Sequence, residues 1–291
     1  MICNLCPRNC GALRTETEGN GVCRMPSLPV VARAALHFWE EPVISGTKGS
    51  GTVFFSGCSL GCVFCQNEEI SHKRFGKKIT PKELADIFKN LEALGAHNIN
   101  LVNPTHYLEA ILQAISIYKP NIPFVYNSGG YETIEAIEKA ASFCDIFLID
   151  LKYVSNDKAE RYSKAKDYPE FAKKAIIKCR EIIGPTVYNE QGIMQKGVIV
   201  RHLILPLATN DAIEVIDFVK HNLKGTALSL MSQYTPCGNL ENHKELQRKI
   251  TKREYEKVLS FAMDSGIEEI FIQELSSSNK DYIPPFDLSG V

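Results

Sequence analysis

Short, nearly continuous apolar runs alternate with amphipathic stretches from residue 51 to the end of the chain. Each run has about five to eight residues and is rich in Val, Ile and Phe, which is typical of strands buried on both faces of a sheet. Strands are therefore predicted at 51–58, 98–102, 123–127, 145–150, 198–205, 227–234 and 268–274.

Helical periodicity fills the stretches between these runs, and some of the helices have clear start signals. Thr80 and Glu83 have the spacing of a capping box, with Pro81 at the first helical position. Thr251 begins a similar pattern, and Asp167 begins one that resembles it. Helices are predicted at 81–94, 107–118, 133–141, 170–183, 210–222 and 252–265.

The alternation of strands and helices predicts right-handed βαβ units and a parallel sheet. Six or seven strands are too few for a closed eight-stranded barrel. The first choice is an α/β fold with a partial, open (β/α)6 barrel, and a doubly wound sheet is the second choice. Ligands bind at the carboxyl ends of the strands in both folds.

Residues 1–50 differ from the rest because they have four cysteines, many Gly, Pro and Asn residues, and little periodicity. We expect them to form a small cysteine-rich N-terminal module and a linker. Residues 51–291 would then form the partial barrel with a C-terminal extension.

Composition and charge argue against several other classes of protein. The 291 residues are 44% hydrophobic and 23% charged, with a net charge of −1. This balance lacks the basic excess of a general nucleic-acid binder. No uncharged apolar stretch approaches the roughly 20 residues of a membrane span, and the N-terminus has no apolar signal-peptide region. We expect a cytoplasmic protein that has neither nucleic acid nor membrane as a partner.

The ten cysteines are the exception to this ordinary composition, and seven of them lie within the first 65 residues. Stable disulfides are rare in the reducing cytosol. Clustered thiols there indicate metal ligands or redox catalysts.

Cys58, Cys62 and Cys65 follow the first predicted strand with C-x3-C-x2-C spacing. A structural zinc ion needs four protein ligands, and a cubane iron–sulfur cluster normally takes four thiolates. Three thiolates leave one iron open for a small molecule. The alternative is a zinc or electron-transfer site completed by a distant fourth cysteine.

This spacing, with an aromatic residue before the last cysteine, resembles the signature of the radical S-adenosylmethionine superfamily. The resemblance implies a [4Fe-4S] cluster on the three cysteines, with S-adenosylmethionine chelated to the open iron. Reduction would cleave the sulfonium and generate a 5′-deoxyadenosyl radical that abstracts hydrogen from a substrate. It also implies the partial barrel, an oxidoreductase activity, and an external electron donor such as flavodoxin or ferredoxin.

Resemblance to pyruvate formate-lyase activating enzymes implies further cofactor contacts at the strand ends. Phe64 would pack beside the adenine, and Asn127 and Ser128 would lie near the ribose and a bound cation. Many relatives have Gly-Gly-Glu after the second strand, whereas this chain has a loop with Thr105 and His106. Either side chain, or backbone carbonyls alone, would hold the methionine amino group; His106 could equally be a helix-start residue.

The same enzymes have the sequence Asp-Leu-Lys, which is found here at 150–152. The resemblance implies that Lys152 binds the methionine carboxylate, that Asp150 helps to hold the site, and that Arg201 lies near the cofactor. The alternatives are a surface ion pair for Asp150 and Lys152, and a carboxylate partner elsewhere for Arg201. His202 would point to the other face of the strand, into the core.

Four further thiols lie within the first 23 residues, at Cys3, Cys6, Cys10 and Cys23. They suffice for a four-coordinate second metal site, with the choice between zinc and iron–sulfur open; free structural thiols are the alternative. The Cys-Pro-Arg-x-Cys stretch resembles a group of activating-enzyme-like radical proteins with this extension. Of the isolated cysteines, Cys144 and Cys179 are expected in the core and Cys237 in a strand-end loop.

The leading hypothesis is a radical S-adenosylmethionine enzyme. It could be an activase that takes a hydrogen from a glycine of a glycyl-radical enzyme, or an enzyme that modifies a small molecule or another peptide. A non-catalytic iron–sulfur or zinc protein, for binding or electron transfer, is the alternative from a different class. No residue is assigned a catalytic role, and the substrate-side candidates are Gln233, Tyr234, Gln273 and Glu274.

Overall fold

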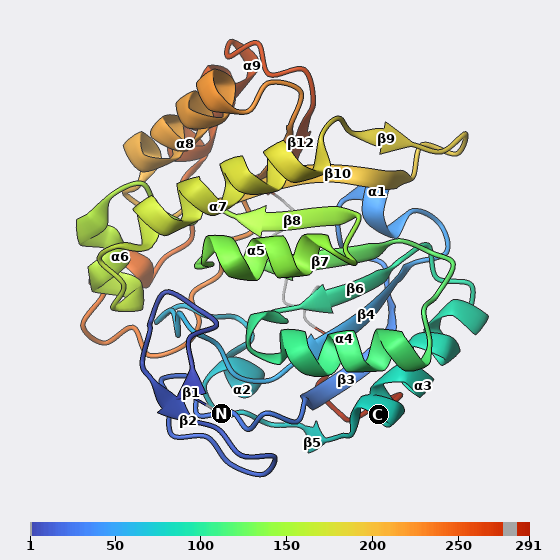
Figure 1. Cartoon of the computed structure of the whole chain (residues 1–291). Coiled ribbons are helices and arrows are strands. Elements are labelled where there is room, and N and C mark those ends of the chain that lie inside the picture. The colour runs from blue at the N-terminus through green and yellow to red at the C-terminus, as the bar shows by residue number, and fades with distance from the viewer. Residues whose placement is uncertain (1, 276–283) are drawn as a thin grey trace.

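The computed structural model describes residues 2–275 and 284–291 of the chain. Within these residues, a small two-stranded sheet (β1, Ile2–Cys3; β2, Ala12–Leu13) stands apart from a ten-stranded sheet. The large sheet has the order β12-β11-β10-β8-β7-β6-β4-β3-β5, with β9 paired to β10 (Figure 1). Its strands are β3 (Val30–His37), β4 (Ser50–Phe55), β5 (Lys77–Lys78), β6 (Ile99–Val102), β7 (Phe124–Ser128), β8 (Ile146–Asp150), β9 (Val187–Tyr188), β10 (Met194–Leu203), β11 (Ala227–Met231) and β12 (Ile270–Ile272).

Helices connect neighbouring parallel strands. The crossovers contain α3 (Pro81–Ala93), α4 (Leu108–Ile117), α5 (Ile134–Ala141), α6 (Asn156–Ser163), α7 (Tyr168–Ile183), α8 (Thr209–Asn222) and α9 (Lys252–Met263). Two short helices, α1 (Pro42–Ser45) and α2 (Glu68–Ser71), and two 3-10 turns, Thr105–Tyr107 and Lys244–Leu246, complete the described elements. No helix in the described ranges has the length and apolar character of a membrane span.

The strands from β4 to β12 that carry these crossovers are parallel and follow one another in chain order. A doubly wound sheet would instead reverse its strand order at a switch point. The sheet is therefore the open, partial (β/α)6 barrel predicted as the first choice. Each of the seven predicted strands overlaps one of these parallel strands.

Helices begin at all three predicted start signals, and two of the three expected capping boxes are formed. Thr80 with Glu83, and Thr251 with Glu254, form complete capping boxes. At the third, α7 begins directly after Asp167, but the capping box is wrong, because Asp167 makes no capping hydrogen bond and has a helical ψ of 0°. Its carboxylate accepts a hydrogen bond from the Tyr131 hydroxyl at 2.7 Å instead.

Strand β3 lies within the segment that we expected to be module and linker. It pairs antiparallel with β4, so the large sheet begins before residue 51. The proposed boundary between residues 1–50 and 51–291 stays a prediction. Residues 276–283 of the expected C-terminal extension lie outside the described residues.

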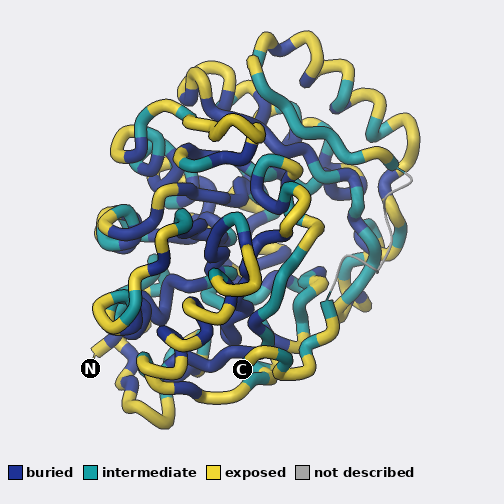
Figure 2. The backbone as a smooth tube through the Cα atoms, turned by 90° about the vertical axis from the view of Figure 1, so that its right-hand side faces the viewer, coloured by how far each residue is buried: buried dark blue, intermediate teal, exposed yellow. Residues whose placement is uncertain are grey.

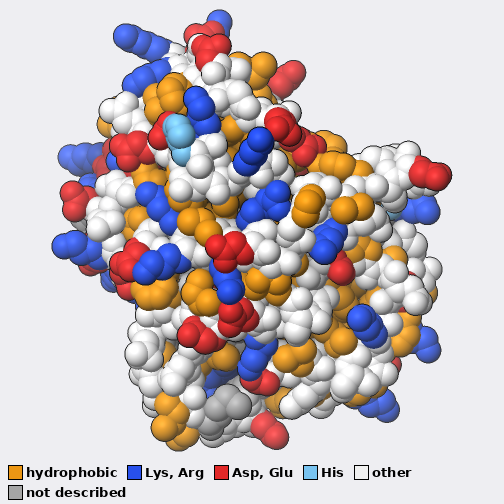
Figure 3. All heavy atoms as spheres, turned by 45° about the horizontal axis from the view of Figure 1, so that its top comes forward, with side chains coloured by type: hydrophobic (Ala, Val, Ile, Leu, Met, Phe, Trp, Pro, Cys, Tyr) orange, Lys and Arg blue, Asp and Glu red, His pale blue; other side chains and the backbone are white. Residues whose placement is uncertain are grey.

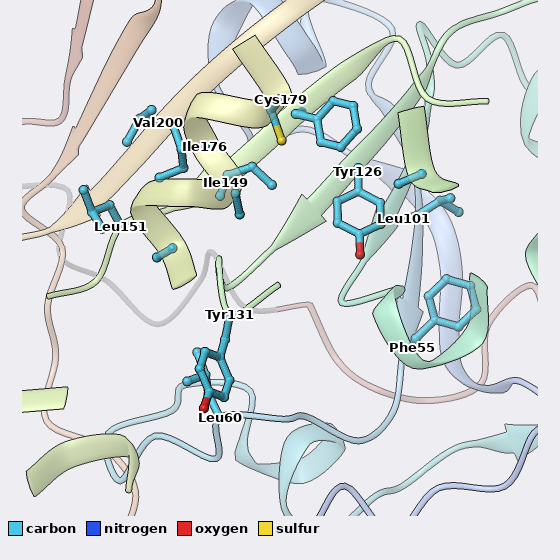
Figure 4. Close-up of a cluster of buried hydrophobic side chains, with 14 of the residues drawn as sticks. Phe55, Leu60, Leu101, Tyr126, Tyr131, Ile149, Leu151, Ile176, Cys179 and Val200 are labelled. Atoms are coloured by element: carbon cyan, nitrogen blue, oxygen red, sulfur yellow. The ribbon is translucent and has the colours of Figure 1, made fainter. Parts of the chain in front are cut away.

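The face of the sheet that is covered by helices contains the main core. Figure 4 shows Leu101, Tyr126, Ile149 and Val200 on successive strands, with Cys179 of α7 packed nearby. Dark blue, buried backbone accordingly runs through the interior in Figure 2, and exposed residues lie on the outer helices and turns. Cys144 and Cys179 are both buried, as predicted.

The other face of the sheet is the inner wall of the partial barrel. At its amino-terminal end, Ile44 of α1 packs in a buried apolar cluster with residues of the four strands β7, β8, β10 and β11: Val125, Ile146, Leu148, Met194, Ile199 and Ala227. Helix α1 therefore plugs this end of the barrel. The next inward-facing positions along the strands are polar, and they form the floor of the site described below.

The C-terminal segment 284–291 lies along β3. The Leu288 amide donates to Ala32 O at 3.0 Å, and the Ala34 amide donates to Ser289 O at 2.9 Å. Phe286 packs edge-on against Phe54 of β4. The chain thus ends at β3, far along the sheet order from β12.

Candidate active site

A cavity of about 930 Å³ lies at the carboxyl ends of the parallel strands. Its lining residues come from both halves of the barrel and include Cys58, Asn127, Asp150, Arg201, Ser229 and Gln273. This is the position that the parallel topology predicts for a ligand site. The outer surface, by contrast, mixes basic and acidic side chains in one view (Figure 3), in line with the net charge of −1.

The loop after β4 brings Cys58, Cys62 and Cys65 to this cavity, and all three line it. Gly57 and Gly61 have positive φ angles of 86° and 61°, which only glycine adopts readily. A Cβ on Gly57 would also lie 2.1 Å from the side chain of Met25. The tight bend that presents the thiols therefore depends on glycine.

Hydrogen bonds hold the three sulfurs in place. The Leu60 amide donates to Cys58 Sγ at 3.3 Å, and the Ser163 hydroxyl donates to Cys62 Sγ at 3.1 Å. The Ser71 hydroxyl donates to Cys65 Sγ at 3.2 Å. Donors aimed at sulfur favour thiolates over thiols.

Burial opposes ionisation at the same loop. It raises the pKa of the Cys58 thiol, and it raises the pKa of Cys65 to about 12. These thiolates therefore need positive charge, which a bound metal group supplies. In the described ranges, no three His, Cys, Asp or Glu side chains are grouped as ligands of one ion. A cubane instead takes each thiolate on a different iron, so three thiols around a wide cavity fit a cluster.

Asp150, Lys152 and Arg201 meet in a charged network on the cavity floor, in which Asp150 is buried and the two cations are half-buried. Lys152 Nζ lies 2.5 Å from Asp150 Oδ2, and Arg201 Nε lies 2.8 Å from Asp150 Oδ1. Burial alone would raise the pKa of Asp150, but attraction from Arg201 and Lys152 outweighs it and lowers that pKa. Burial would lower the pKa of Lys152, but Asp150 and Cys62 raise it. All three groups are therefore charged at neutral pH.

Glu40 completes this network and was missed from the sequence. Its Oε2 lies 3.1 Å from Arg201, and its Oε1 accepts from the amides of Asn100 and Asn127 at 3.0 and 3.1 Å. Asn127 Oδ1 in turn accepts from Arg201 at 2.6 Å. Glu40 lies in the segment that is predicted to be a linker. The one available signal was a pair of adjacent acids before Pro42.

The hydroxyls of Thr105 and Ser128 point to Glu132, a second residue that was not predicted from the sequence. Their hydroxyls donate to Glu132 Oε1 at 2.7 and 2.6 Å, and the Tyr126 hydroxyl donates to Oε2 at 3.3 Å. Burial raises the pKa of Glu132 to about 7. Ser128 lines the large cavity, whereas Thr105 lines a smaller one.

His106 and His202 both serve the packing of the fold. His106 Nε2 lies 2.8 Å from Ser56 O, and burial lowers its pKa to about 3. It lies in the 3-10 turn before α4, as its interpretation as a helix-start residue predicts. His202 is buried with Nδ1 2.7 Å from Leu151 O, as expected for a core residue.

Phe64 lines the cavity and is wedged between three tyrosines. Its ring meets those of Tyr153, Tyr162 and Tyr234 at centroid distances of 6.4, 6.1 and 6.0 Å. The Cys237 thiol donates to Phe64 O at 3.1 Å and also lines the cavity. The substrate-side candidates Gln233, Tyr234, Gln273 and Glu274 line it too.

The four N-terminal cysteines line one small cavity next to the thiol loop. Cys3, Cys6, Cys10 and Cys23 share it with Ser59, the residue after Cys58. Burial raises the pKa of Cys23, and it raises that of Cys6 to about 12. The four described thiols thus lie around one cavity beside the main site, but they are not arranged as the ligands of a single ion.

Arg8 joins this N-terminal segment to the thiol loop. Its guanidinium donates to Ser59 O at 2.8 Å, to Leu60 O at 3.3 Å and to Ser163 O at 2.7 Å. It also lies 5.3 Å from the ring centroid of Tyr131. One side chain between Cys6 and Cys10 therefore bonds to the backbone between Cys58 and Cys62.

The chain is similar in sequence to a known protein family and in fold to solved structures. The sequence model of the Radical SAM superfamily matches residues 52–194. The uncharacterised protein MJ0674 of Methanocaldococcus jannaschii is 33% identical over 279 residues, which cover 92% of this chain and 76% of that protein.

Two solved structures share the fold. SuiB of Streptococcus suis superposes with a TM-score of 0.54 at 13% identity, over 79% of this chain and 50% of SuiB. The chain thus spans about half the length of SuiB. Methylornithine synthase (PylB) superposes with a TM-score of 0.50 at 14% identity, over 85% of this chain and 74% of PylB. SuiB is known in complexes with S-adenosylmethionine and with the precursor peptide SuiA.

Proposed function

Because the chain belongs to the radical SAM superfamily, we propose that its strand-end cavity is the active site and that Cys58, Cys62 and Cys65 hold the [4Fe-4S] cluster that the family implies. The observation that carries this proposal is that three thiols of one loop line the same cavity as a buried, charged floor. When bound, the cluster and S-adenosylmethionine supply an electron and a 5′-deoxyadenosyl radical for hydrogen abstraction.

The residues of the chain would bind and orient this cofactor. Lys152, which lies close enough to Cys62 for the two charges to interact, would hold the methionine carboxylate. Asp150 would fix Lys152 and Arg201, while Phe64 would pack beside the adenine and Asn127 near the ribose. All three side-chain nitrogens of Arg201 are bonded to Asp150, Glu40 and Asn127. Its role would therefore be to fix these side chains in the wall of the cavity.

Thr105 and Ser128 would act through Glu132. Both hydroxyls already donate to that carboxyl, which fixes the turns after β6 and β7. We propose that they position backbone groups beside the cofactor instead of binding it with their hydroxyls.

A peptide or protein segment is the proposed substrate. The support is that SuiB, which shares the fold, is known in complex with a precursor peptide. A glycyl-radical enzyme would be one such substrate, and the chain would then be an activase. An external electron donor such as flavodoxin or ferredoxin would reduce the cluster.

Anaerobic reconstitution with iron and sulfide, followed by dithionite and S-adenosylmethionine, tests the enzymatic proposal. The wild type should release 5′-deoxyadenosine, and Cys62→Ala should release none. Cys237→Ala is the matched control, because that thiol lines the same cavity outside the triad; it should keep both cluster and activity. A well-formed cluster that never cleaves the cofactor would show a binding or electron-transfer protein instead.

We further propose that Cys3, Cys6, Cys10 and Cys23 bind a second metal. Support comes from their place around one cavity. The wild type should contain about four more irons per chain than Cys3→Ala/Cys6→Ala if the site holds a cubane, or one more zinc if it holds a single ion. Equal iron and equal zinc in the two proteins would reject the proposal.

A further inference from the structure

Glu41 is a buried acid in the wall of the large cavity, and no relative or motif assigns it a role. Its side chain lines the cavity, and the residue is only 8% exposed. Its Oε2 is buried and has no hydrogen-bond partner. Leaving a buried carboxylate oxygen unbonded costs stability. Such a group is therefore a candidate for binding a molecule that enters the cavity.

The backbone holds Glu41 firmly in this position. It immediately precedes α1, and its carbonyl accepts from the amides of Ile44 and Ser45 at 2.8 and 3.0 Å. Ile44 is fully buried in the apolar plug beneath the charged floor. The carboxylate is thus fixed in the wall and does not depend on a mobile loop.

The two basic side chains that line the cavity are already bonded to groups other than Glu41. Arg201 bonds to Asp150, Glu40 and Asn127, and Lys152 bonds to Asp150. Attraction from Arg201 opposes the burial that raises the pKa of Glu41, but burial is the larger effect. Among the described residues that line the cavity, four are acidic (Glu40, Glu41, Asp150 and Glu274) and two are basic (Lys152 and Arg201). Even with Glu41 counted as neutral, three acidic residues face two basic ones, so the lining favours a ligand with positive charge.

The position of Glu41 points to the substrate side of the cavity. Ser229 of β11 lies within hydrogen-bonding reach of its carboxyl. Ser229 is paired in register with Phe271 of β12, and both line the cavity. Gln273, just beyond β12, has a second buried side-chain oxygen without a partner. The proposed cofactor contacts instead come from the β4–β8 half of the barrel.

We propose that Glu41 binds a positively charged nitrogen of the substrate, an amine or a guanidine. A cation would satisfy the unbonded oxygen and offset the acidic excess in one contact. This inference rests on the proposed function only in taking this cavity as the place where substrate binds.

Calorimetric titration of the iron-reconstituted full-length chain tests the inference without cofactor or reductant. The probes are 4-phenylbutylamine, 4-phenylbutanol and 4-phenylbutyrate, which share an apolar body and differ in charge. The wild type should bind the amine about tenfold more tightly than the alcohol, a difference of about 1.4 kcal/mol, because only the amine forms a charged hydrogen bond with Glu41. It should bind the carboxylate most weakly. Equal affinity for the amine and the alcohol would overturn the inference, and this comparison needs no variant.

Glu41→Gln should abolish the preference for the amine and leave the affinity for the alcohol unchanged. Glu256→Gln removes the same charge from an exposed helix surface and should retain the preference, which separates a contact with Glu41 from an effect of net charge. A similar loss in both variants would overturn the assignment to Glu41. Because these titrations involve no turnover, failure of the proposed radical chemistry would be seen separately, as the absence of 5′-deoxyadenosine.

Discussion

At the scale of single residues, Arg201 is the centre of the charged floor. Its guanidinium bonds to two carboxylates and an amide that come from three different segments of the chain: Glu40, Asn127 and Asp150. Breaking a buried ion pair leaves uncompensated charge, which costs far more than losing a surface pair. The floor should therefore respond to mutation as a single unit.

Arg201→Ala should lower the free energy of unfolding by about 3–5 kcal/mol, because Glu40 and Asp150 lose their shared partner. Urea denaturation measures this change. Lys174→Ala is the control, since Lys174 pairs with Glu170 on an exposed helix surface; it should cost about 0.5 kcal/mol or less. Similar losses in the two variants would contradict the buried network.

Glu132 should make the free energy of unfolding depend on pH. Burial raises its folded pKa to about 7, above its ordinary value of 4.5. The folded chain therefore holds this proton more tightly than the unfolded chain does. Its contribution to stability is complete below pH 4.5 and is lost as the pH rises towards 7.

Glu132→Gln should flatten the fall in unfolding free energy between pH 5 and pH 8, because the neutral amide does not titrate. Denaturant titrations of both proteins at several pH values give the difference. Glu138→Gln, on the exposed side of α5, should keep the slope of the wild type. An unchanged slope in Glu132→Gln would show that Glu132 does not titrate in this range.

At the scale of elements, the N-terminal segment and the thiol loop act as one structure. Arg8 bonds to four backbone carbonyls of the loop and of the end of α6, at Ser59, Leu60, Ser163 and Lys164. Ser163 also donates to Cys62 Sγ. A change at the first cysteine group should therefore reach the second through the backbone.

Arg8→Lys should lower iron bound at the thiol loop and 5′-deoxyadenosine release severalfold, because an ammonium group cannot span several carbonyls as a guanidinium fork does. Iron analysis and product quantification test this expectation. Arg24→Lys is the control, since Arg24 lies on the same segment but is exposed. Full iron content in Arg8→Lys would show that the contact is dispensable for the loop.

At the scale of the whole molecule, the partial barrel is plugged by α1 and continues past β4 into an antiparallel edge. The C-terminal segment packs along β3 there, with Gly290 against the backbone of Ala34. A Cβ on Gly290 would lie 2.0 Å from Ala34 O. The docking of the chain end on β3 therefore requires glycine at this position.

Gly290→Ala should detach this segment and speed hydrogen exchange at the Ala34 amide, which donates to Ser289 O. Exchange measured by mass spectrometry over β3 and the last residues reports the effect. Gly184→Ala is a matched control, since Gly184 also has positive φ but has open space where a Cβ would lie. If exchange over β3 stays slow in Gly290→Ala, the docking does not depend on this glycine.

Most of the fold could be predicted because its signals are local. Continuous apolar runs marked the parallel strands, and the capping boxes at Thr80 and Thr251 marked two helix starts. Strand β3 was missed because it lies in a segment interpreted from its cysteines and glycines. At Asp167, the local pattern predicted a helix cap, but the carboxylate accepts a hydrogen bond from the distant Tyr131 hydroxyl instead.

The sequence by itself determined the order of strands and helices, the C-x3-C-x2-C loop at a strand end, and the charged residues on β8 and β10, because each depends on spacing along the chain. Only the tertiary structure decided that Glu40 pairs with Arg201 and that Glu132 accepts hydrogen bonds from Thr105 and Ser128. It also decided that Arg8 bonds to the thiol loop and that Glu41 has an oxygen without a hydrogen bond. These contacts join segments that are up to about 160 residues apart. Their geometry depends on the register of the strands and the curvature of the sheet, which cannot be derived from the separation of residues along the chain.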